Sequence, residues 1–138
     1  MYILIVEDSE TFAKLMQHWL KQAGCETAIA PTMAEAKASL SKRAPDLILL
    51  DLTLPCVQGI KTYQTMRRLA PDIETVILTG GEDDKVREQA ERDGVKYILK
   101  NPISLNDNNR LFIDFLLARV EIIKMRNQMT PQTARNGG

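Results

Sequence analysis

A short apolar run that ends in a carboxylate constrains the fold of this chain most strongly. The predicted strand at residues 46–50 contains four consecutive apolar residues, from Leu47 to Leu50, and Asp51 follows directly. The turn residues Pro55 and Gly59 come soon after. Such a run is typical of a strand buried on both faces, as in a parallel sheet between helices. Asp51 would then lie at the strand's carboxyl end, where open α/β sheets bind ligands. The alternative is that Asp51 only caps the following loop.

The rest of the chain alternates between strand and helix patterns. We expect the other strands at residues 2–6, 25–30, 73–78 and 95–99. We expect helices from Ser9 to about Gln22, from Thr32 to about Arg43, from Gly59 to Leu69, from Glu82 to Asp93, and from near Ser104 to about Met129. Ser9 is a favourable N-cap, and Thr32 with Glu35 has the spacing of a capping box. Strict alternation predicts an α/β domain, a doubly wound parallel sheet with helices on both faces.

Composition and charge exclude several classes of protein. At 138 residues the chain is long enough for one domain, and its 18 basic and 18 acidic residues cancel. No global basic field favours nucleic acid or an anionic membrane. The first apolar segment meets Glu7 and Asp8 too soon for a signal peptide, and no apolar run could span a bilayer. Cys25 and Cys56 fit neither a metal motif nor a disulfide framework, so we expect reduced thiols and a cytoplasmic protein.

Polar side chains follow four of the five predicted strands. Glu7 and Asp8 follow the first, Asp51 the third, Thr79 the fourth and Lys100 the fifth. The carboxyl ends of parallel strands share one edge of a sheet, so these residues should converge. Three neighbouring carboxylates repel one another, and a hard divalent cation with oxygen ligands would compensate them. We therefore expect a Mg²⁺ site, with Mn²⁺ as the alternative ion.

A site of this kind suits phosphoryl transfer. The cation and Lys100 would neutralise phosphoryl oxygens, and a carboxylate would act as the nucleophile to form an acyl phosphate. Thr79 could donate a hydrogen bond to the phosphoryl group. Gly80 and Gly81 would leave an uncrowded backbone beside it.

These residues, in this order and spacing, resemble a response regulator receiver domain of two-component signalling, over residues 1 to about 120. The resemblance implies a flavodoxin-like fold of five strands in the order 2-1-3-4-5 with five helices. It implies that Asp51 is the phosphoacceptor. It also implies that Asp8 binds Mg²⁺ directly, that Glu7 acts mostly through water, and that Thr53 contributes its backbone carbonyl.

The resemblance assigns further roles around the acceptor. By this resemblance Thr79 is the switch hydroxyl and Tyr97 is the switch aromatic residue. Lys100 corresponds to the lysine that members of the family carry at this position. Pro55 and Gly59 match the loop after the acceptor. A histidine kinase or phosphotransfer protein would supply the phosphoryl group, and a downstream target would respond. Such a receiver catalyses only its own phosphorylation and dephosphorylation.

Two positions depart from the family pattern. Receivers usually carry proline directly after the lysine, but Asn101 stands between Lys100 and Pro102 here. The residue after the switch hydroxyl is often alanine, whereas this chain has Gly80 followed by Gly81. We expect a rebuilt loop on the lysine side and a looser loop after Thr79.

The last helix carries apolar residues beyond the usual end of a receiver. We expect the receiver domain at residues 1–120, and at 121–138 an extension of the last helix followed by a disordered tail. Leu116, Val120 and Ile123 continue at helical spacing, with Ile122 and Met125 beside them. Exposed apolar residues of this kind need a partner. The alternatives are a homodimer through this helix, a linker to an output module, and a tail that folds back on its own domain.

Three other functions fit parts of the pattern. A phosphohydrolase with an aspartate nucleophile is the main alternative, but haloacid-dehalogenase-like enzymes place a second acid where this chain has Thr53. A flavodoxin-like redox module is disfavoured because the acidic pocket would repel a flavin phosphate. A pseudo-receiver that serves only as an interaction module would not need the complete set of acids, Thr79 and Lys100.

Overall fold

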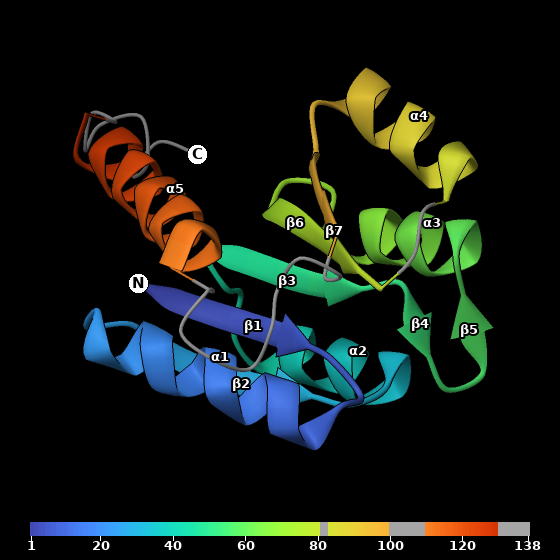
Figure 1. Ribbon diagram of the computed structural model, residues 1–138, viewed down its shortest axis with the longest axis horizontal. Helices are drawn as coiled ribbons and strands as arrows, with labels where there is room; N and C mark the ends of the chain where they lie inside the picture. Colours follow the sequence, from blue (N-terminus) through green and yellow to red (C-terminus); the bar gives the residue numbers. More distant parts are fainter. Residues whose placement is uncertain (81–82, 100–109, 130–138) are drawn as a thin grey trace.

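A five-stranded parallel sheet forms the centre of the protein. The computed structural model describes residues 1–80, 83–99 and 110–129 (Figure 1). The sheet strands are β1 (Tyr2–Val6), β2 (Glu26–Ala30), β3 (Leu47–Asp51), β6 (Glu74–Thr79) and β7 (Lys96–Leu99). They pair in parallel in the order β2-β1-β3-β6-β7. This confirms the predicted order 2-1-3-4-5, because β4 and β5 belong to a separate hairpin.

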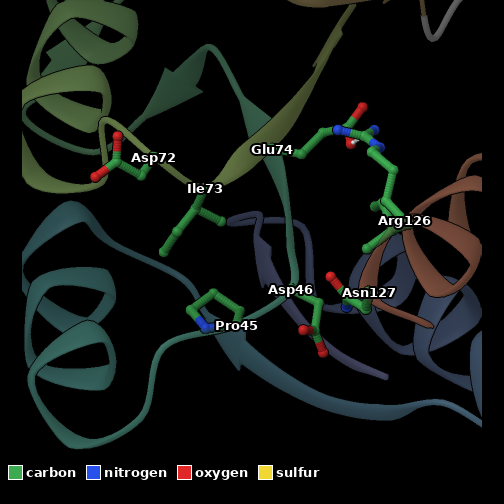
Figure 2. A pocket seen from close by; sticks show the side chains of 8 residues that line it. Pro45, Asp46, Asp72, Ile73, Glu74, Arg126 and Asn127 are labelled. Atoms are coloured by element: carbon green, nitrogen blue, oxygen red, sulfur yellow. Dashed lines mark hydrogen bonds and ion pairs between the residues drawn. The ribbon is translucent and has the colours of Figure 1, made fainter. Parts of the chain in front are cut away.

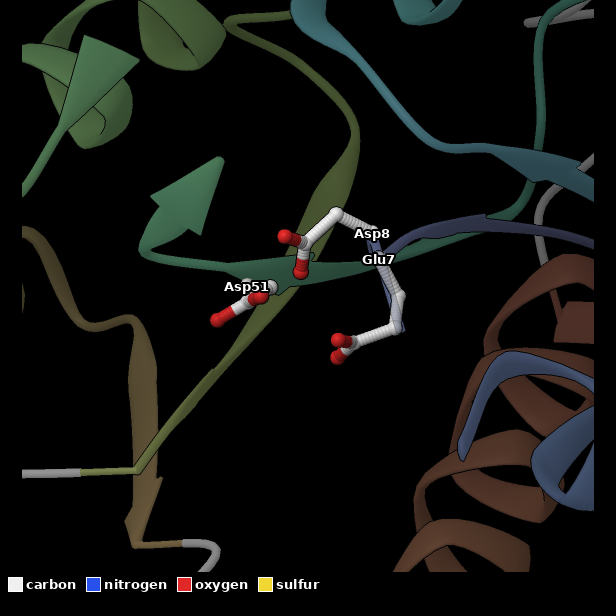
Figure 3. A group of neighbouring side chains, drawn as sticks. All are labelled: Glu7, Asp8 and Asp51. Carbon is white, nitrogen blue, oxygen red and sulfur yellow. The ribbon is translucent and has the colours of Figure 1, made fainter. Parts of the chain in front are cut away.

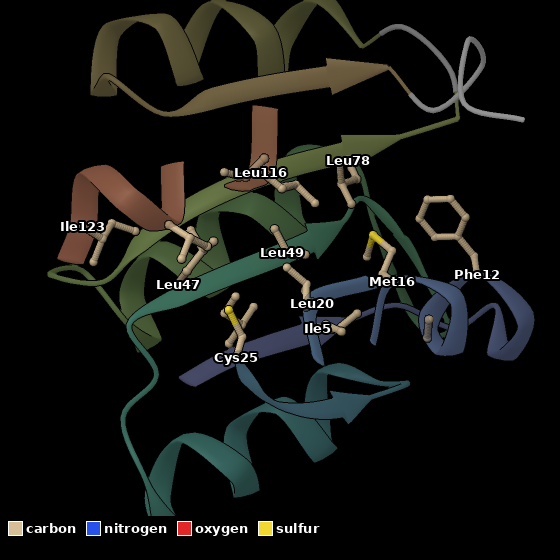
Figure 4. Close-up of a cluster of buried hydrophobic side chains, with 14 residues drawn as sticks. Ile5, Phe12, Met16, Leu20, Cys25, Leu47, Leu49, Leu78, Leu116 and Ile123 are labelled. Atoms are coloured by element: carbon tan, nitrogen blue, oxygen red, sulfur yellow. The ribbon is translucent and has the colours of Figure 1, made fainter. Parts of the chain in front are cut away.

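Helices cover both faces of this sheet. Within the described residues they are α1 (Glu10–Gln22), α2 (Met33–Lys42), α3 (Ile60–Leu69), α4 (Asp84–Asp93) and α5 (Arg110–Met129). Alternate residues of a strand point to opposite faces. On one face, Ile5 and Leu49 pack with residues of α1 and α5 (Figure 4). On the other, Leu4 and Leu50 pack with α2 and α3, while Ile77 joins a smaller cluster with α3 and α4. The predicted doubly wound architecture is confirmed.

Side-chain caps determine where three of the helices begin. The Ser9 hydroxyl accepts a hydrogen bond from the Phe12 N–H, and the Thr32 hydroxyl accepts one from the Glu35 N–H. Asp83 caps α4 in the same way by accepting from the Val86 N–H at 3.1 Å. Each cap satisfies an N–H that the first helical turn leaves without a partner.

A small hairpin after β3 was not predicted from the sequence. β4 (Thr53–Leu54) and β5 (Val57–Gln58) pair in antiparallel fashion around the two-residue turn of Pro55 and Cys56. Proline favours the first turn position, and Cys56 at the second has φ 69°. A positive φ normally selects glycine or asparagine there, so the cysteine concealed the turn in the sequence.

Helix α5 continues without a break past residue 120. Ile123 is only 6% exposed and lies in the same core cluster as Leu116 and Val120. Ile122 and Met125 are 41% and 58% exposed. Residues 121–129, here called the α5 extension, therefore pack on the domain through Ile123. The predicted helix start near Ser104 and the tail at 130–138 lie outside the described residues.

The arginines of α5 also tie it to the sheet. Arg119 forms an ion pair with Glu74 at the beginning of β6. Arg126 of the α5 extension pairs with the same carboxylate at 2.7 Å (Figure 2). Within the part of the chain that the structure describes, no helix is both long and apolar enough to cross a lipid bilayer.

Candidate phosphoryl-transfer site

Strand register aligns the predicted site residues at one edge of the sheet. Val6 pairs with Leu50, so Glu7 and Asp8 follow β1 at the level where Asp51 ends β3. On the other side Asp51 pairs with Leu78, directly before Thr79. Parallel pairing therefore brings residues 7, 51 and 79 to the same edge, as the sequence predicted.

The three acidic side chains form a compact group, here called the acidic cluster. Glu7, Asp8 and Asp51 each offer a carboxylate oxygen, and these three atoms all lie within 4.8 Å of one another. Figure 3 shows the side chains reaching one region from the ends of β1 and β3. Glu7 and Asp51 are only 2% and 3% exposed, whereas Asp8 is exposed. Clustered carboxylate oxygens match the ligand preference of Mg²⁺, so the donor set fits that ion.

Backbone N–H groups hold two of these carboxylates in place. Glu7 Oε1 accepts from the Ser9 N–H at 3.1 Å, and Asp51 Oδ1 accepts from the Thr53 N–H at 3.1 Å. The second bond shows that Asp51 caps the loop that follows it, as one interpretation of the sequence proposed. Asp51 also lies beside Glu7 and Asp8, so it caps the loop and belongs to the acidic cluster at the same time.

The loop after Asp51 is closed onto the start of α3. The Leu52 carbonyl accepts from the Gly59 N–H at 2.9 Å and from the Thr62 hydroxyl at 3.2 Å. Gly59 has φ 61°, and a Cβ there would lie 3.0 Å from Asp83 Oδ2. The positive φ favours glycine at position 59, and a larger residue would also have to displace the Asp83 carboxylate at the start of α4.

The Thr79 side chain is buried at the end of β6, and Gly80 follows it. A Cβ built at Gly80 would meet no other atom within 4 Å. Packing among the described residues therefore does not demand glycine at this position. Gly81 lies outside the described residues.

Tyr97 lies on β7 with its ring partly buried against the cluster that α3 and α4 share. Its hydroxyl accepts a hydrogen bond from the Asp83 N–H at 2.9 Å. The Arg87 guanidinium lies 5.3 Å from the ring centroid. The tyrosine thus contacts the amino end of α4, which begins five residues after Thr79.

Sequence reasoning missed the part of this edge that α4 supplies. A cavity of about 480 Å³ adjoins the site, and its lining includes Thr53, Gln58, Thr79, Asp83 and Lys85. Asp83, three residues before the first buried position of α4, had the spacing of an N-cap and could have been found. Gln58 of the hairpin and Lys85 of α4 line the same cavity although they are distant in sequence, and no local sequence pattern predicts that arrangement.

The part of the predicted site that follows β7 lies outside the described residues. Leu99 pairs with Thr79 at the last described position of β7. Lys100, Asn101 and Pro102 lie outside the described residues, so the role of Lys100 and the rebuilt loop stay predictions.

Comparison with known proteins gives the family. The sequence profile of the response regulator receiver domain matches residues 3–111. A response regulator receiver protein of Anaeromyxobacter sp. (strain Fw109-5) is 31% identical over 102 residues, covering 74% of this chain and 43% of that protein. The Regulator of RpoS of Escherichia coli (strain K12) is 30% identical over 109 residues, covering 79% of this chain and 32% of the relative.

The solved structures agree with the fold. The non-phosphorylated HemR receiver domain from Leptospira biflexa is 27% identical, with a TM-score of 0.69 over 88% of this chain and 92% of that one. The two curated relatives are longer than the match, since the chain covers less than half of each. Together with the profile match over most of the chain, these findings show that the protein belongs to the response regulator receiver domain family of two-component signalling.

Proposed function

We propose that the protein is switched by phosphorylation of Asp51 in the presence of Mg²⁺. The observation that carries this proposal is the acidic cluster, which brings carboxylates from two strands within 4.8 Å of one another at the ligand-binding edge of the sheet. Asp8 and Asp51 bind the ion directly, Glu7 acts mostly through water, and the backbone carbonyl of Thr53 completes the protein ligands. When bound, Mg²⁺ neutralises the carboxylates and the phosphoryl oxygens.

The reaction needs only the transfer of the phosphoryl group. An oxygen of Asp51 attacks phosphorus, the bond from phosphorus to the donor's leaving atom breaks, and the electron pair stays with that atom. The product is an aspartyl phosphate. Thr79 donates its hydroxyl hydrogen to a phosphoryl oxygen, and Lys100 supplies positive charge to the same group.

The switch follows from the added charge. Thr79 and the loop after it move toward the phosphoryl group, and Tyr97 changes its packing. That movement breaks the present hydrogen bond from the Asp83 N–H to the Tyr97 hydroxyl and frees the amino end of α4. The two states then expose different surfaces to a downstream partner.

The proposed partners and location follow from the family. A histidine kinase or a phosphotransfer protein in the cytoplasm donates the phosphoryl group, and the receiver catalyses only its own phosphorylation and dephosphorylation. The domain boundary at residue 120 stays a prediction. The burial of Ile123 supports including at least part of the α5 extension in any fragment that must fold.

A homodimer through α5 is a second proposal. Its support is the exposure of Ile122 and Met125 on the α5 extension. Sedimentation of the wild-type chain and of Ile122→Asp tests it. A dimer that the substitution dissociates would support the proposal, whereas equal monomeric behaviour would contradict it. This point variant is preferable to a cut at Arg119, which would also remove the buried Ile123.

Intact-mass measurement tests the main proposal. The wild-type protein, incubated with Mg²⁺ and acetyl phosphate or phosphoramidate, should gain one labile phosphoryl group. Asp51→Asn should gain none, and the matched control Asp72→Asn, whose carboxylate lies in a different pocket, should behave as the wild type. Turnover of many unrelated phosphoesters would favour a phosphohydrolase instead. No adduct with any donor would favour a pseudo-receiver.

A further inference from the structure

Residues of the hairpin and of the amino end of α4 line a cavity next to the strand end that carries the acceptor. Thr53 and Thr79, which flank Asp51 along the chain and across the sheet, both line it. The remaining wall includes Gln58 of β5 and Lys85 of α4. The space of about 480 Å³ is large enough to admit a small organic group beside the phosphoryl position.

Lys85 is the one basic residue that lines this cavity among the described residues. Its neighbour Arg87 is engaged elsewhere, against Asp84 at 3.8 Å and over the Tyr97 ring. Lys85 is exposed and forms no ion pair with any described residue. Its ammonium group is therefore available to an anion in the cavity.

Among the described residues that line the cavity, Asp83 is the one acidic residue, and it already caps α4. Asp83 Oδ1 accepts from the Val86 N–H at 3.1 Å as the cap of the helix. The positive end of the helix dipole offsets its charge there. Asp83 is thus held at the start of α4, and Lys85 is the charged side chain of the described lining that stays available to an incoming anion.

We infer that Lys85 and the Gln58 amide, which line the same cavity, bind the leaving group of a small acyl phosphate donor. The inference rests on the proposed function and extends it to the choice of donor. When Asp51 attacks acetyl phosphate, the bond from phosphorus to the acyl oxygen breaks and its electron pair leaves with acetate. Negative charge develops on that oxygen in the transition state, and a cation beside it lowers the barrier.

A donor with a neutral leaving group provides the contrast. Phosphoramidate carries a protonated nitrogen, so the bond from phosphorus to nitrogen breaks and ammonia leaves without charge. No negative charge develops on the leaving atom, and Lys85 has nothing to stabilise there. The two donors transfer the same phosphoryl group to the same oxygen, so their comparison isolates the leaving group.

The experiment measures the rate of adduct formation at Asp51 in Mg²⁺ for both donors. Lys85→Gln should slow the reaction with acetyl phosphate about fivefold and leave phosphoramidate within about twofold of the wild type. Lys85→Arg should keep most of the acetyl phosphate rate. Lys61→Gln is the matched control, because it removes the same charge from an exposed position of α3 outside the cavity lining.

Each contrary result has a distinct meaning. Equal slowing with both donors, or no slowing with either, would overturn the role of Lys85 while leaving Asp51 as acceptor. The same loss in Lys61→Gln would show an effect of net charge and would also overturn it. A wild-type chain that gains no phosphoryl group from either donor would overturn the proposed function together with this inference.

Discussion

The carboxylates at the two ends of the central sheet have different neighbours. At the amino end, Glu74 pairs with Arg119 and Arg126, and Glu26 pairs with Arg43 at 2.7 Å. Asp46, just before β3, accepts from the Tyr2 N–H at 2.8 Å. At the carboxyl end, the acidic cluster places three carboxylates against one another. Paired charges hold the helices to the sheet at one end, whereas like charges gathered at the other are suited to binding a cation.

This contrast also concerns the cost of each arrangement. Carboxylates that have cationic partners contribute to stability or are neutral to it, depending on exposure. Carboxylates that face one another repel, and this repulsion raises the free energy of the folded state by an amount that a bound cation would reduce. Under the proposed function a bound cation offsets the repulsion within the acidic cluster, while the ion pairs at the amino end contribute to the stability of the fold. The predictions below test both halves of this account.

The largest expected effect concerns the α5 extension at the amino end. Ile123→Ala removes a side chain that is 6% exposed in the main core cluster, and we expect a loss of about 2–4 kcal/mol in the free energy of unfolding. Ile122→Ala, its 41% exposed neighbour, should change that value by less than about 0.5 kcal/mol. Urea denaturation measures both, and similar losses would mean that the extension does not pack as described.

The next effect concerns the ion pairs of Glu74. Its side chain and that of Arg119 are each 18% exposed, so the pair is largely shielded from water. Glu74→Gln should cost about 1–2 kcal/mol in unfolding free energy. Glu121→Gln is the control, since its pair with Lys124 is exposed and should contribute less than about 0.5 kcal/mol. Equal losses in the two variants would contradict the claim that the shielded ion pairs of Glu74 stabilise the fold more than an exposed pair does.

A third effect concerns another partnered carboxylate away from the cluster. The buried Tyr63 hydroxyl donates to Asp93 Oδ2 at 2.5 Å, and Tyr63→Phe should cost about 1 kcal/mol at neutral pH. Burial, then the bond to Asp93, raises the pKa of Tyr63 above its ordinary 10.0. The hydrogen bond from Tyr63 is the main cause that lowers the pKa of Asp93 below its ordinary 3.8.

The two shifts set the pH range of that contribution. A raised folded-state pKa stabilises the protonated tyrosine, so its contribution is present below pH 10 and is lost as the pH rises further. A lowered pKa stabilises the ionised carboxylate, so that contribution is present above pH 3.8 and is lost as the pH falls. Denaturation of wild type and Tyr63→Phe across pH should show a difference that is flat between these limits. A difference that grows outside them would contradict the assignment.

The smallest effect concerns repulsion within the acidic cluster. Asp8→Asn removes one of three neighbouring carboxylates and should raise the stability of the metal-free protein by about 0.5 kcal/mol. With Mg²⁺ present, the order should reverse because the variant lacks a ligand. Thermal unfolding with and without Mg²⁺ measures this change. A variant that is less stable in metal-free buffer would show that the carboxylates do not oppose one another.

Local patterns predicted much of the fold. The caps at Ser9 and Thr32, the alternation of strands and helices, and the apolar run before Asp51 each depend on residues close in sequence. The convergence of Asp8 and Asp51 could also be predicted, because parallel pairing fixes which strand ends meet. Resemblance to the family supplied the strand order and the individual roles of the site residues.

Features that depend on distant contacts were not predictable in this way. Helical spacing puts Ile123 on the same face of α5 as Leu116 and Val120, but it does not say whether this face packs on the same domain or on a partner, since that depends on where α5 lies against the sheet. The pairing of Glu74 with Arg126 joins residues 52 positions apart. The hairpin around Cys56 has two-residue strands, too short for a periodic pattern, and a turn residue that sequence rules do not favour.

Calorimetric titration with Mg²⁺ tests the central claim most directly. We expect one ion to bind the wild-type protein and Asp72→Asn, whose changed side chain lines the pocket at the amino end. Asp8→Asn should bind at least about tenfold more weakly, because it loses a charged ligand of the acidic cluster. Undiminished binding by Asp8→Asn, or a loss confined to Asp72→Asn, would contradict the account.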